Sequence, residues 1–151
     1  MQQSGIDAEN GENPTLYERI GLKLGVAAPR SDSDLVTLVE HRLSVQALAS
    51  LVKHGLAEQE IFSLVLPRRT LTHRRAKHQL LTREESDRVV RLARVTALAE
   101  QVFGDDAKAA RWLRKAKRRF GSRSPLEMLA TETGARLVEE MLYQIDDGVV
   151  A

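Results

Sequence analysis

Residues 68–77 (RRTLTHRRAK) constrain the fold of this 151-residue chain more than any other stretch. They hold five Lys or Arg side chains and a single large apolar residue, Leu71. Directly before them, Leu66 and Pro67 mark a helix stop, and an amphipathic run occupies residues 57–64. A short helix, a tight turn and a short basic helix are the outline of a helix-turn-helix DNA reader.

The charge of the chain is distributed unevenly. The formal net charge of +2 resolves into −4 for residues 1–67, +11 for residues 68–123 and −5 for residues 124–151. Seventeen of the 23 Lys and Arg residues lie in the central segment. A basic band between two acidic ends is typical of a protein that contacts a polyanion such as DNA.

Composition favours helices and excludes several classes of protein. The chain is rich in Leu, Ala, Val, Arg and Glu, and its aromatic content is 4%, which favours helix over sheet. Cysteine is absent, which excludes disulfides, thiolate metal sites and a cysteine nucleophile. There is no 18-residue apolar run, and the polar N-terminus lacks the apolar centre of a signal peptide. We therefore expect a cytoplasmic protein without a membrane partner.

Start and stop signals predict a mainly α chain. Thr82 with Glu85 and Ser124 with Glu127 form capping boxes, the second with Pro125 at the first helical position. Gly25, Gly55 and Gly104 would each end a helix. The expected helices cover residues 15–24, 44–54 with Ser44 as N-cap, 57–64, 68–77, 83–103, 105–115, a short helix that begins after Ser124, and 133–147 with Leu137, Val138, Met141, Leu142 and Ile145 buried.

Three segments are less regular. Residues 1–14 have almost nothing to bury and are expected to be disordered, and residues 27–34 form a linker around Pro29. Residues 35–43 fit two patterns. Leu35, Leu38, Val39 and Leu43 suit a helix, whereas Leu35, Thr37 and Val39 alternate as in a strand, so both assignments stay open.

The basic helix is the first candidate site. With Leu71 toward the core, base edges would be met by Arg69, Thr70, Thr72 and His73 near the helix N-terminus. Phosphates would be met by Arg68, Arg74, Arg75 and Lys77. The alternatives are a solvated basic face or a protein-docking surface.

A second basic cluster comprises Lys115, Lys117, Arg118, Arg119 and Arg123. Trp112 precedes this cluster, and Phe120 lies between Arg119 and Arg123. It would hold DNA phosphates, hold an acidic partner or form a plain surface loop, and the residues alone leave all three open. A lone Trp is more often a core residue than a binding hot spot.

Signals of catalysis are poor. The four histidines (His41, His54, His73 and His78) lack metal-ligand spacing. There is no glycine-rich phosphate loop and no nucleophile elbow. We expect no enzyme, no metal site and no cofactor.

Taken together, these motifs resemble the Xre-type antitoxins of bacterial RES–Xre toxin–antitoxin modules. The resemblance covers about residues 34–151 and is carried by Arg69-Thr70-Leu71, Leu81-Thr82, Glu84-Glu85-Ser86-Asp87-Arg88, Arg91-Leu92-Ala93-Arg94, Ala99-Glu100, Val102-Phe103-Gly104, Ala110, Trp112-Leu113, Ser124-Pro125-Leu126, Met128-Leu129, Gly134, Val138-Glu139, Met141-Leu142, Ile145 and Gly148. The chain departs from the family at Arg75, where members often carry an apolar residue, and in the loop 115–123, which is more basic than usual and lacks a frequent Asn.

The resemblance implies three regions: an N-terminal segment (1–33) with a possible role in dimerisation, a Cro/repressor-like helix-turn-helix region (34–96) and a helical toxin-binding domain (97–151). It also implies a RES toxin that destroys NAD and autoregulation through operator DNA. Because a single ten-residue reader contacts too few base pairs for operator specificity, we also expect a homodimer. The C-terminal end would obstruct the toxin's cleft. The implied toxin-binding residues are Trp112, Phe120, Arg123, Leu142, Ile145, Gly148, Val149, Val150 and Ala151.

Two rival hypotheses remain beside a non-enzymatic antitoxin. The first is a free-standing helix-turn-helix repressor without a toxin partner, and the second is a helical adaptor that binds no DNA. The gene next to this one separates the first two, and a gel-shift assay separates both from the adaptor.

Overall fold

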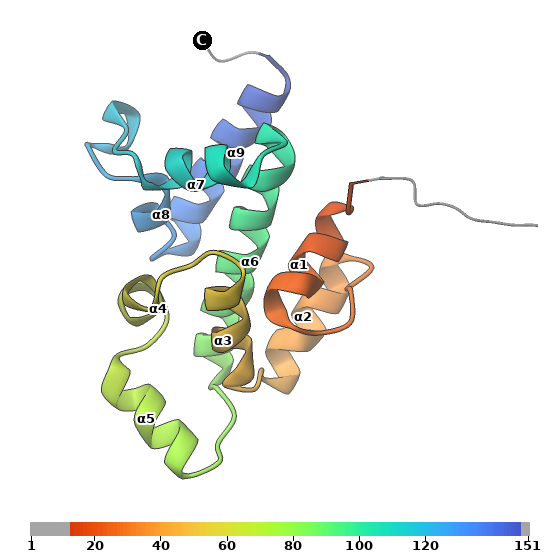
Figure 1. Ribbon diagram of the computed structural model, residues 1–151, viewed down its shortest axis with the longest axis vertical. Helices are drawn as coiled ribbons and strands as arrows, with labels where there is room; N and C mark the ends of the chain where they lie inside the picture. Colours follow the sequence, from red (N-terminus) through yellow and green to blue (C-terminus); the bar gives the residue numbers. More distant parts are fainter. Residues whose placement is uncertain (1–12, 149–151) are drawn as a thin grey trace, which may run out of the picture.

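The computed structural model describes residues 13–148, and within them every regular element is helical (Figure 1). The elements are α1 (Leu16–Leu24), α2 (Asp32–His41), α3 (Gln46–Lys53), α4 (Glu58–Leu64), α5 (Arg68–Ala76), α6 (Arg83–Phe103), α7 (Asp106–Arg114), the 3-10 turn η1 (Arg118–Phe120), α8 (Pro125–Met128) and α9 (Glu132–Asp146). The mainly α fold predicted from the sequence is confirmed. None of the described helices is long and apolar enough to cross a membrane.

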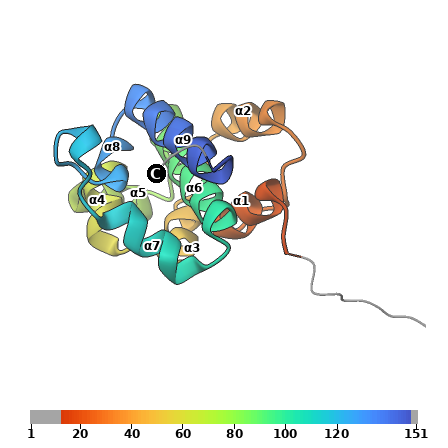
Figure 2. The ribbon, with the colours of Figure 1, turned by 90° about the horizontal axis from the view of Figure 1, so that it is seen from above.

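The 21-residue helix α6 is the axis of the molecule. Helices α1, α2, α3, α7 and α9 pack around it, with α1 and α2 on the side away from α7 (Figures 1 and 2). Apolar residues occur around much of its circumference, as expected for a helix with neighbours on several sides. Its fully or nearly fully buried positions include Val89, Leu92, Val95, Leu98 and Ala99.

The helix ends follow from local chemistry. The hydroxyls of Thr15, Thr82 and Ser124 accept N–H bonds from Glu18, Glu85 and Glu127, whose carboxylates bind back to the cap N–H groups. At the C-terminus of α6, Gly104 takes a left-handed backbone with φ 65°, a conformation that glycine adopts without steric cost. Both capping boxes predicted from the sequence, at Thr82 and Ser124, are therefore confirmed.

The segment 35–43, left open between helix and strand, is helical as far as residue 41. It belongs to α2, which begins at Asp32 because the Ser31 hydroxyl accepts the Asp34 N–H at 3.2 Å. The predicted linker over residues 27–34 was therefore too long at its C-terminal end. Arg42 ends α2 with φ 65°, and Leu43 is buried beyond it.

Two smaller predictions were wrong. Ser44 does not cap α3: the cap position is Val45, and the Ser44 hydroxyl accepts only the Gln46 N–H, at 3.1 Å. Leu137 on α9 is 44% exposed rather than buried, because the helix turns Val138, Met141 and Leu142 toward the core instead. The predicted disorder of residues 1–14 falls largely outside the described residues.

Candidate functional site

The α4–α5 pair has the predicted two-helix geometry. Val65 and Leu66 are buried at the turn, and Pro67 stands at the N-cap of α5 with an extended backbone. Leu71 is the buried residue of α5, with 5% of its surface exposed. This anchor turns one side of α5 to the core and the rest of the helix outward, at the end of the molecule opposite the C-terminal helices (Figure 1).

The outward side of α5 is a row of hydrogen-bond donors. Arg68, Arg69, Thr72, His73, Arg75 and Lys77 are all exposed, and Thr70 is half-buried. The guanidinium of Arg68 lies over the Phe62 ring at 4.5 Å, which orients it without consuming its hydrogen bonds. The Thr72 hydroxyl donates to the Arg68 carbonyl at 3.1 Å and keeps its acceptor capacity. We call these seven residues the reader face.

Arg74, assigned from sequence to a phosphate, has a different environment. Its guanidinium binds Glu85 through two hydrogen bonds, Nε to Oε1 at 3.1 Å and Nη2 to Oε2 at 3.0 Å. Its remaining nitrogen donates to Gln79 Oε1 at 3.2 Å. The hydrogen bond to Glu85 raises the pKa of Arg74. Because all three nitrogens are engaged within the protein, Arg74 is not part of the reader face.

Arg75 is exposed at the rim of a pocket of about 350 Å³ between α3, α4 and α5. Leu48, Val52, Phe62 and Leu71 supply its apolar lining. An apolar side chain at position 75 would cover this lining. Here the guanidinium stays in water and adds a cation to the reader face instead.

The C-terminal candidates separate into core and surface residues. Phe120 is 4% exposed and Leu142 is fully buried, so both hold the domain together and present no surface to a partner. Trp112 is half-buried, with its ring 5.5 Å from Phe103 and the Lys117 ammonium 5.0 Å above it. The prediction that Phe120 and Leu142 contact a toxin stays a prediction; in this structure both side chains are buried in the core.

The basic loop 115–123 is ordered by its own backbone. Lys117 and Arg123 form an isolated antiparallel bridge, and Gly121 and Ser122 take left-handed conformations with φ of 64° and 66°. Burial and the neighbouring Lys115 charge lower the pKa of Lys117. Arg119 donates to the Gln144 side chain at 3.1 Å, which holds the loop against α9. The loop therefore presents its exposed cations, Lys115, Arg118, Arg119 and Arg123, from a fixed frame.

The end of α9 completes this surface. Ile145 is half-buried, Gly148 is exposed with φ 72°, and Val149, Val150 and Ala151 lie outside the described residues. Leu137 and Tyr143, which sequence reasoning did not select, are 44% and 51% exposed on the same helix. An exposed Leu inside an apolar helix pattern has no separate sequence signal, because periodicity does not reveal which face a neighbour covers.

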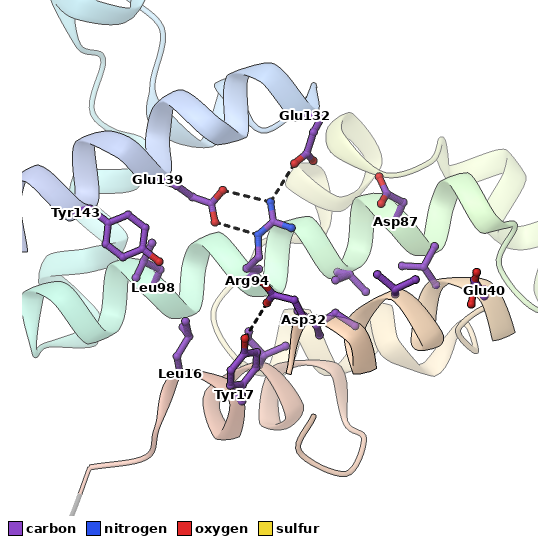
Figure 3. Close-up of a pocket in the computed structure, with 15 residues that line it drawn as sticks. Leu16, Tyr17, Asp32, Glu40, Asp87, Arg94, Leu98, Glu132, Glu139 and Tyr143 are labelled. Carbon is purple, nitrogen blue, oxygen red and sulfur yellow. Dashed lines mark hydrogen bonds and ion pairs between the residues drawn. The ribbon is translucent and has the colours of Figure 1, made fainter. Parts of the chain in front are cut away.

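A groove of about 520 Å³ runs between α1, α2, α6 and α9 (Figure 3). Arg94 projects into it from α6 and binds Glu139 at 3.0 Å and Glu132 at 3.3 Å. Across the groove, the Tyr17 hydroxyl donates to Asp32 at 2.8 Å, a hydrogen bond that raises the pKa of Tyr17. These charges pair with one another, so the groove forms a junction between the helices rather than a free ligand site.

A second junction joins the α4–α5 pair to the C-terminal helices. Arg114, at the end of α7, binds both carboxylate oxygens of Glu60 at 2.8 Å and the Gly55 carbonyl at 3.1 Å. Glu60 also accepts the Ala57 N–H at the start of α4. Helix α4 is therefore connected to α7 through the Arg114–Glu60 pair. Among the described residues, no group of three or more His, Asp or Glu side chains could hold a metal ion.

Comparisons with known proteins find family matches for two segments of the chain. Residues 34–94 match the antitoxin Xre-like helix-turn-helix domain, and residues 98–148 match the antitoxin Xre/MbcA/ParS C-terminal toxin-binding domain. A protein named Antitoxin Xre from Pseudomonas putida is 51% identical over 84 residues, which cover 56% of this chain and 53% of that protein. A second Antitoxin Xre, from Yersinia enterocolitica, is 40% identical over 85 residues, 56% of this chain and 57% of that protein. The aligned region spans about half the length of these relatives.

Proposed function

The chain belongs to the Xre antitoxin family, and from that premise we propose that it neutralises an NAD-degrading RES toxin by direct binding and represses its own operon by binding operator DNA. In this proposal the protein is not an enzyme. The reader face binds DNA, and the C-terminal helices with the tail bind the toxin and obstruct its active site.

The proposed DNA binding is supported by the reader face. Its Arg and Lys side chains are exposed on a helix that a single buried leucine anchors, so they are free to meet an external polyanion. Arg69, Thr70, Thr72 and His73 lie on the first part of α5, where such helices contact base edges, and an arginine can bind guanine through two hydrogen bonds. Arg68, Arg75 and Lys77 supply contacts to phosphates.

The toxin half is supported by the surface around α9. Arg123 and Gly148 are exposed, Trp112 and Ile145 are half-buried, and Leu137 and Tyr143 are exposed apolar residues of α9. Phe120 and Leu142 are buried in the core. Val149, Val150 and Ala151 would enter the toxin's cleft, as the family resemblance implies. Two copies of the antitoxin would act as a homodimer, since one nine-residue helix contacts too few base pairs for operator specificity and paired half-sites add their binding energies.

Reciprocal variants test the two halves separately. Arg69→Ala with Thr70→Ala should weaken operator binding, because each lost base contact costs about 1–3 kcal/mol, while growth rescue from the co-expressed toxin persists. A chain that lacks residues 148–151 should lose growth rescue and keep its operator affinity. Gel shifts, toxin pull-down and growth are measured for both variants at matched expression.

Three outcomes would contradict the proposal. If the first variant binds the operator normally, the DNA-reading surface lies elsewhere. If the shortened chain rescues growth, the tail does not obstruct the toxin. If the neighbouring gene encodes no RES toxin and the wild type binds none, the alternative of a free-standing helix-turn-helix repressor holds.

A further inference from the structure

Helix α5 has few contacts to hold it in place. Within α5, Leu71 is the only buried residue, and Pro67 gives the helix N-terminus no side-chain cap. A helix that reads base edges must nevertheless keep its angle closely, because displaced side chains lose the geometry of paired hydrogen bonds. Something besides Leu71 must set the orientation of α5.

The bidentate contact from Arg74 to Glu85 is in a position to set the orientation of α5. The two hydrogen bonds of 3.1 and 3.0 Å are parallel arms of one planar pair, which fixes direction as well as distance. The side chains of Arg74 and Glu85 are 19% and 9% exposed, so water competes little for the contact. One arginine of α5 is therefore joined to the first turn of α6.

Glu85 is itself anchored on α6. Its Oε1 accepts the Thr82 N–H at 2.8 Å, and its own N–H donates to the Thr82 hydroxyl at 3.0 Å. The contact thus links α5 to the start of the central helix through the capping box.

The segment that joins α5 to α6 reverses direction and so places Glu85 beside α5. Gln79 N–H donates to the Arg74 carbonyl at 2.9 Å and His78 N–H donates to the Arg75 carbonyl at 3.2 Å, with His78 at φ 52°. These two bonds form a Schellman motif, which reverses the chain at the end of α5. The carbonyl and the guanidinium of Arg74 therefore both make hydrogen bonds that stabilise the connection from α5 to α6.

We propose that the Arg74–Glu85 pair is a brace that sets the angle of α5 on α6, so that Arg74 is a positioning residue for DNA reading. The inference rests on the proposed DNA binding and specifies how the reader face is held. A carboxylate beside a DNA-binding helix repels phosphates on charge alone, so its presence there needs a compensating structural role. Burial alone would raise the pKa of Glu85, but the Arg74 contact and the Thr82 N–H outweigh burial and leave that pKa lowered.

The test compares Arg74→Gln, Glu85→Gln and the double variant in the full chain. Glutamine at position 85 keeps the acceptor for the Thr82 N–H and removes the charge. The affinity for a duplex from directly upstream of the chain's own gene is measured by fluorescence anisotropy over a range of salt concentrations. Far-UV circular dichroism and hydrogen exchange of the α5 amides report on folding and on the attachment of α5.

Glu85→Gln should weaken DNA binding at least about fivefold, although it removes a negative charge. Arg74→Gln should weaken it by a similar factor and leave the slope of log affinity against log salt unchanged. The double variant should lose no more than either single variant, because both remove one contact. The α5 amides should exchange faster in all three.

Two controls frame the result. Glu84→Gln changes the exposed neighbour, which makes no side-chain hydrogen bond or ion pair among the described residues, and should bind DNA as well as the wild type or better. Arg75→Gln removes an exposed cation of the reader face and should reduce the salt slope by about 0.9, the value for one phosphate contact.

Other outcomes overturn the brace. Tighter binding by Glu85→Gln, together with a salt slope reduced by about 0.9 in Arg74→Gln, would make Arg74 a phosphate ligand that Glu85 restrains. Unchanged affinity and unchanged amide exchange in both single variants would show that α5 needs no brace. If the wild type itself fails to prefer this duplex over a scrambled one, the proposed operator binding fails, which is a separate result from failure of the brace.

Discussion

Gly134 lies where the first turn of α9 crosses the end of α8. A Cβ atom built there would overlap the Met128 carbonyl oxygen and lie 2.9 Å from the Met128 carbonyl carbon. Its N–H donates to the Thr131 hydroxyl at 2.9 Å, which caps α9. The atoms that a Cβ would meet belong to the Met128 backbone, so no flexible side chain could move aside. This position therefore requires glycine for space rather than for its dihedral freedom.

Gly134→Ala should therefore destabilise the protein by about 1–3 kcal/mol or more, because the added methyl group forces α9 away from α8. Thermal unfolding followed by circular dichroism measures the effect. Thr133→Ala, at the exposed neighbouring position, is the control and should change the midpoint little. An unchanged midpoint for Gly134→Ala would mean that α8 and α9 are packed more loosely than described.

At the scale of the helices, arginine–carboxylate pairs connect different helices to one another. Arg114 joins α7 to α4, Arg74 joins α5 to α6, and Arg94 joins α6 to α9. Arg91 adds a further pair to Glu132, with 9% of the Arg91 side chain exposed. Such pairs specify geometry more than they add net stability, since each charge also loses hydration.

Two of these pairs predict how stability depends on pH. Burial alone would raise the pKa values of Glu60 and Glu85, yet hydrogen bonds from Arg114 and Arg74 outweigh it and leave both pKa values below the usual 4.5. A carboxyl whose pKa is lowered in the folded state contributes stability that is present above the unfolded-state pKa and is lost as pH falls through the folded-state pKa. We therefore expect the urea concentration at the unfolding midpoint to decrease as the pH is lowered below about 4.5.

The variants Glu60→Gln and Glu85→Gln should each flatten this decline, since an amide binds no proton in that range. Urea titrations at several pH values between about 7 and 3 measure it. Glu84→Gln, which alters an exposed carboxylate of the same turn, is the control and should keep the wild-type pH dependence. A steep decline that persists in both test variants would place the acid sensitivity in other carboxylates.

At the scale of the whole molecule, the two family segments share one helix. The match to the helix-turn-helix domain ends at residue 94 and the match to the C-terminal domain begins at residue 98, both inside α6. Ala93, Val95, Ala97 and Ala99 around this boundary are 0% exposed. Helices of both segments thus bury their apolar faces against the same axis.

We therefore expect both segments to unfold in one cooperative transition. The single Trp of the chain, Trp112, reports on α7, whereas far-UV circular dichroism reports on all helices. Denaturant curves from the two probes in the same samples should coincide in midpoint and slope. Two separated midpoints would show that α6 carries two independent units.

The sequence by itself determined much of the local structure. Capping residues such as Thr82 and Ser124, and the stop at Gly104, act within a few positions of themselves, so their effects can be predicted without neighbours. The composition of residues 68–77 likewise determined a short basic helix with Leu71 inward. The motifs of the two halves were also enough to indicate the family.

Only the tertiary structure decided which chemically suitable residues are free to act. Arg74 resembles its neighbours in sequence, but the returning chain places Glu85 against it and removes it from the reader face. Leu137 and Leu142 belong to one apolar pattern, yet the packing of α9 exposes the first and buries the second. Residues 35–41 are helical, and both Leu35 within the helix and Leu43 beyond it are buried in the core. Each result depends on contacts across many residues, and periodicity along the chain contains no information about which neighbour will cover which face.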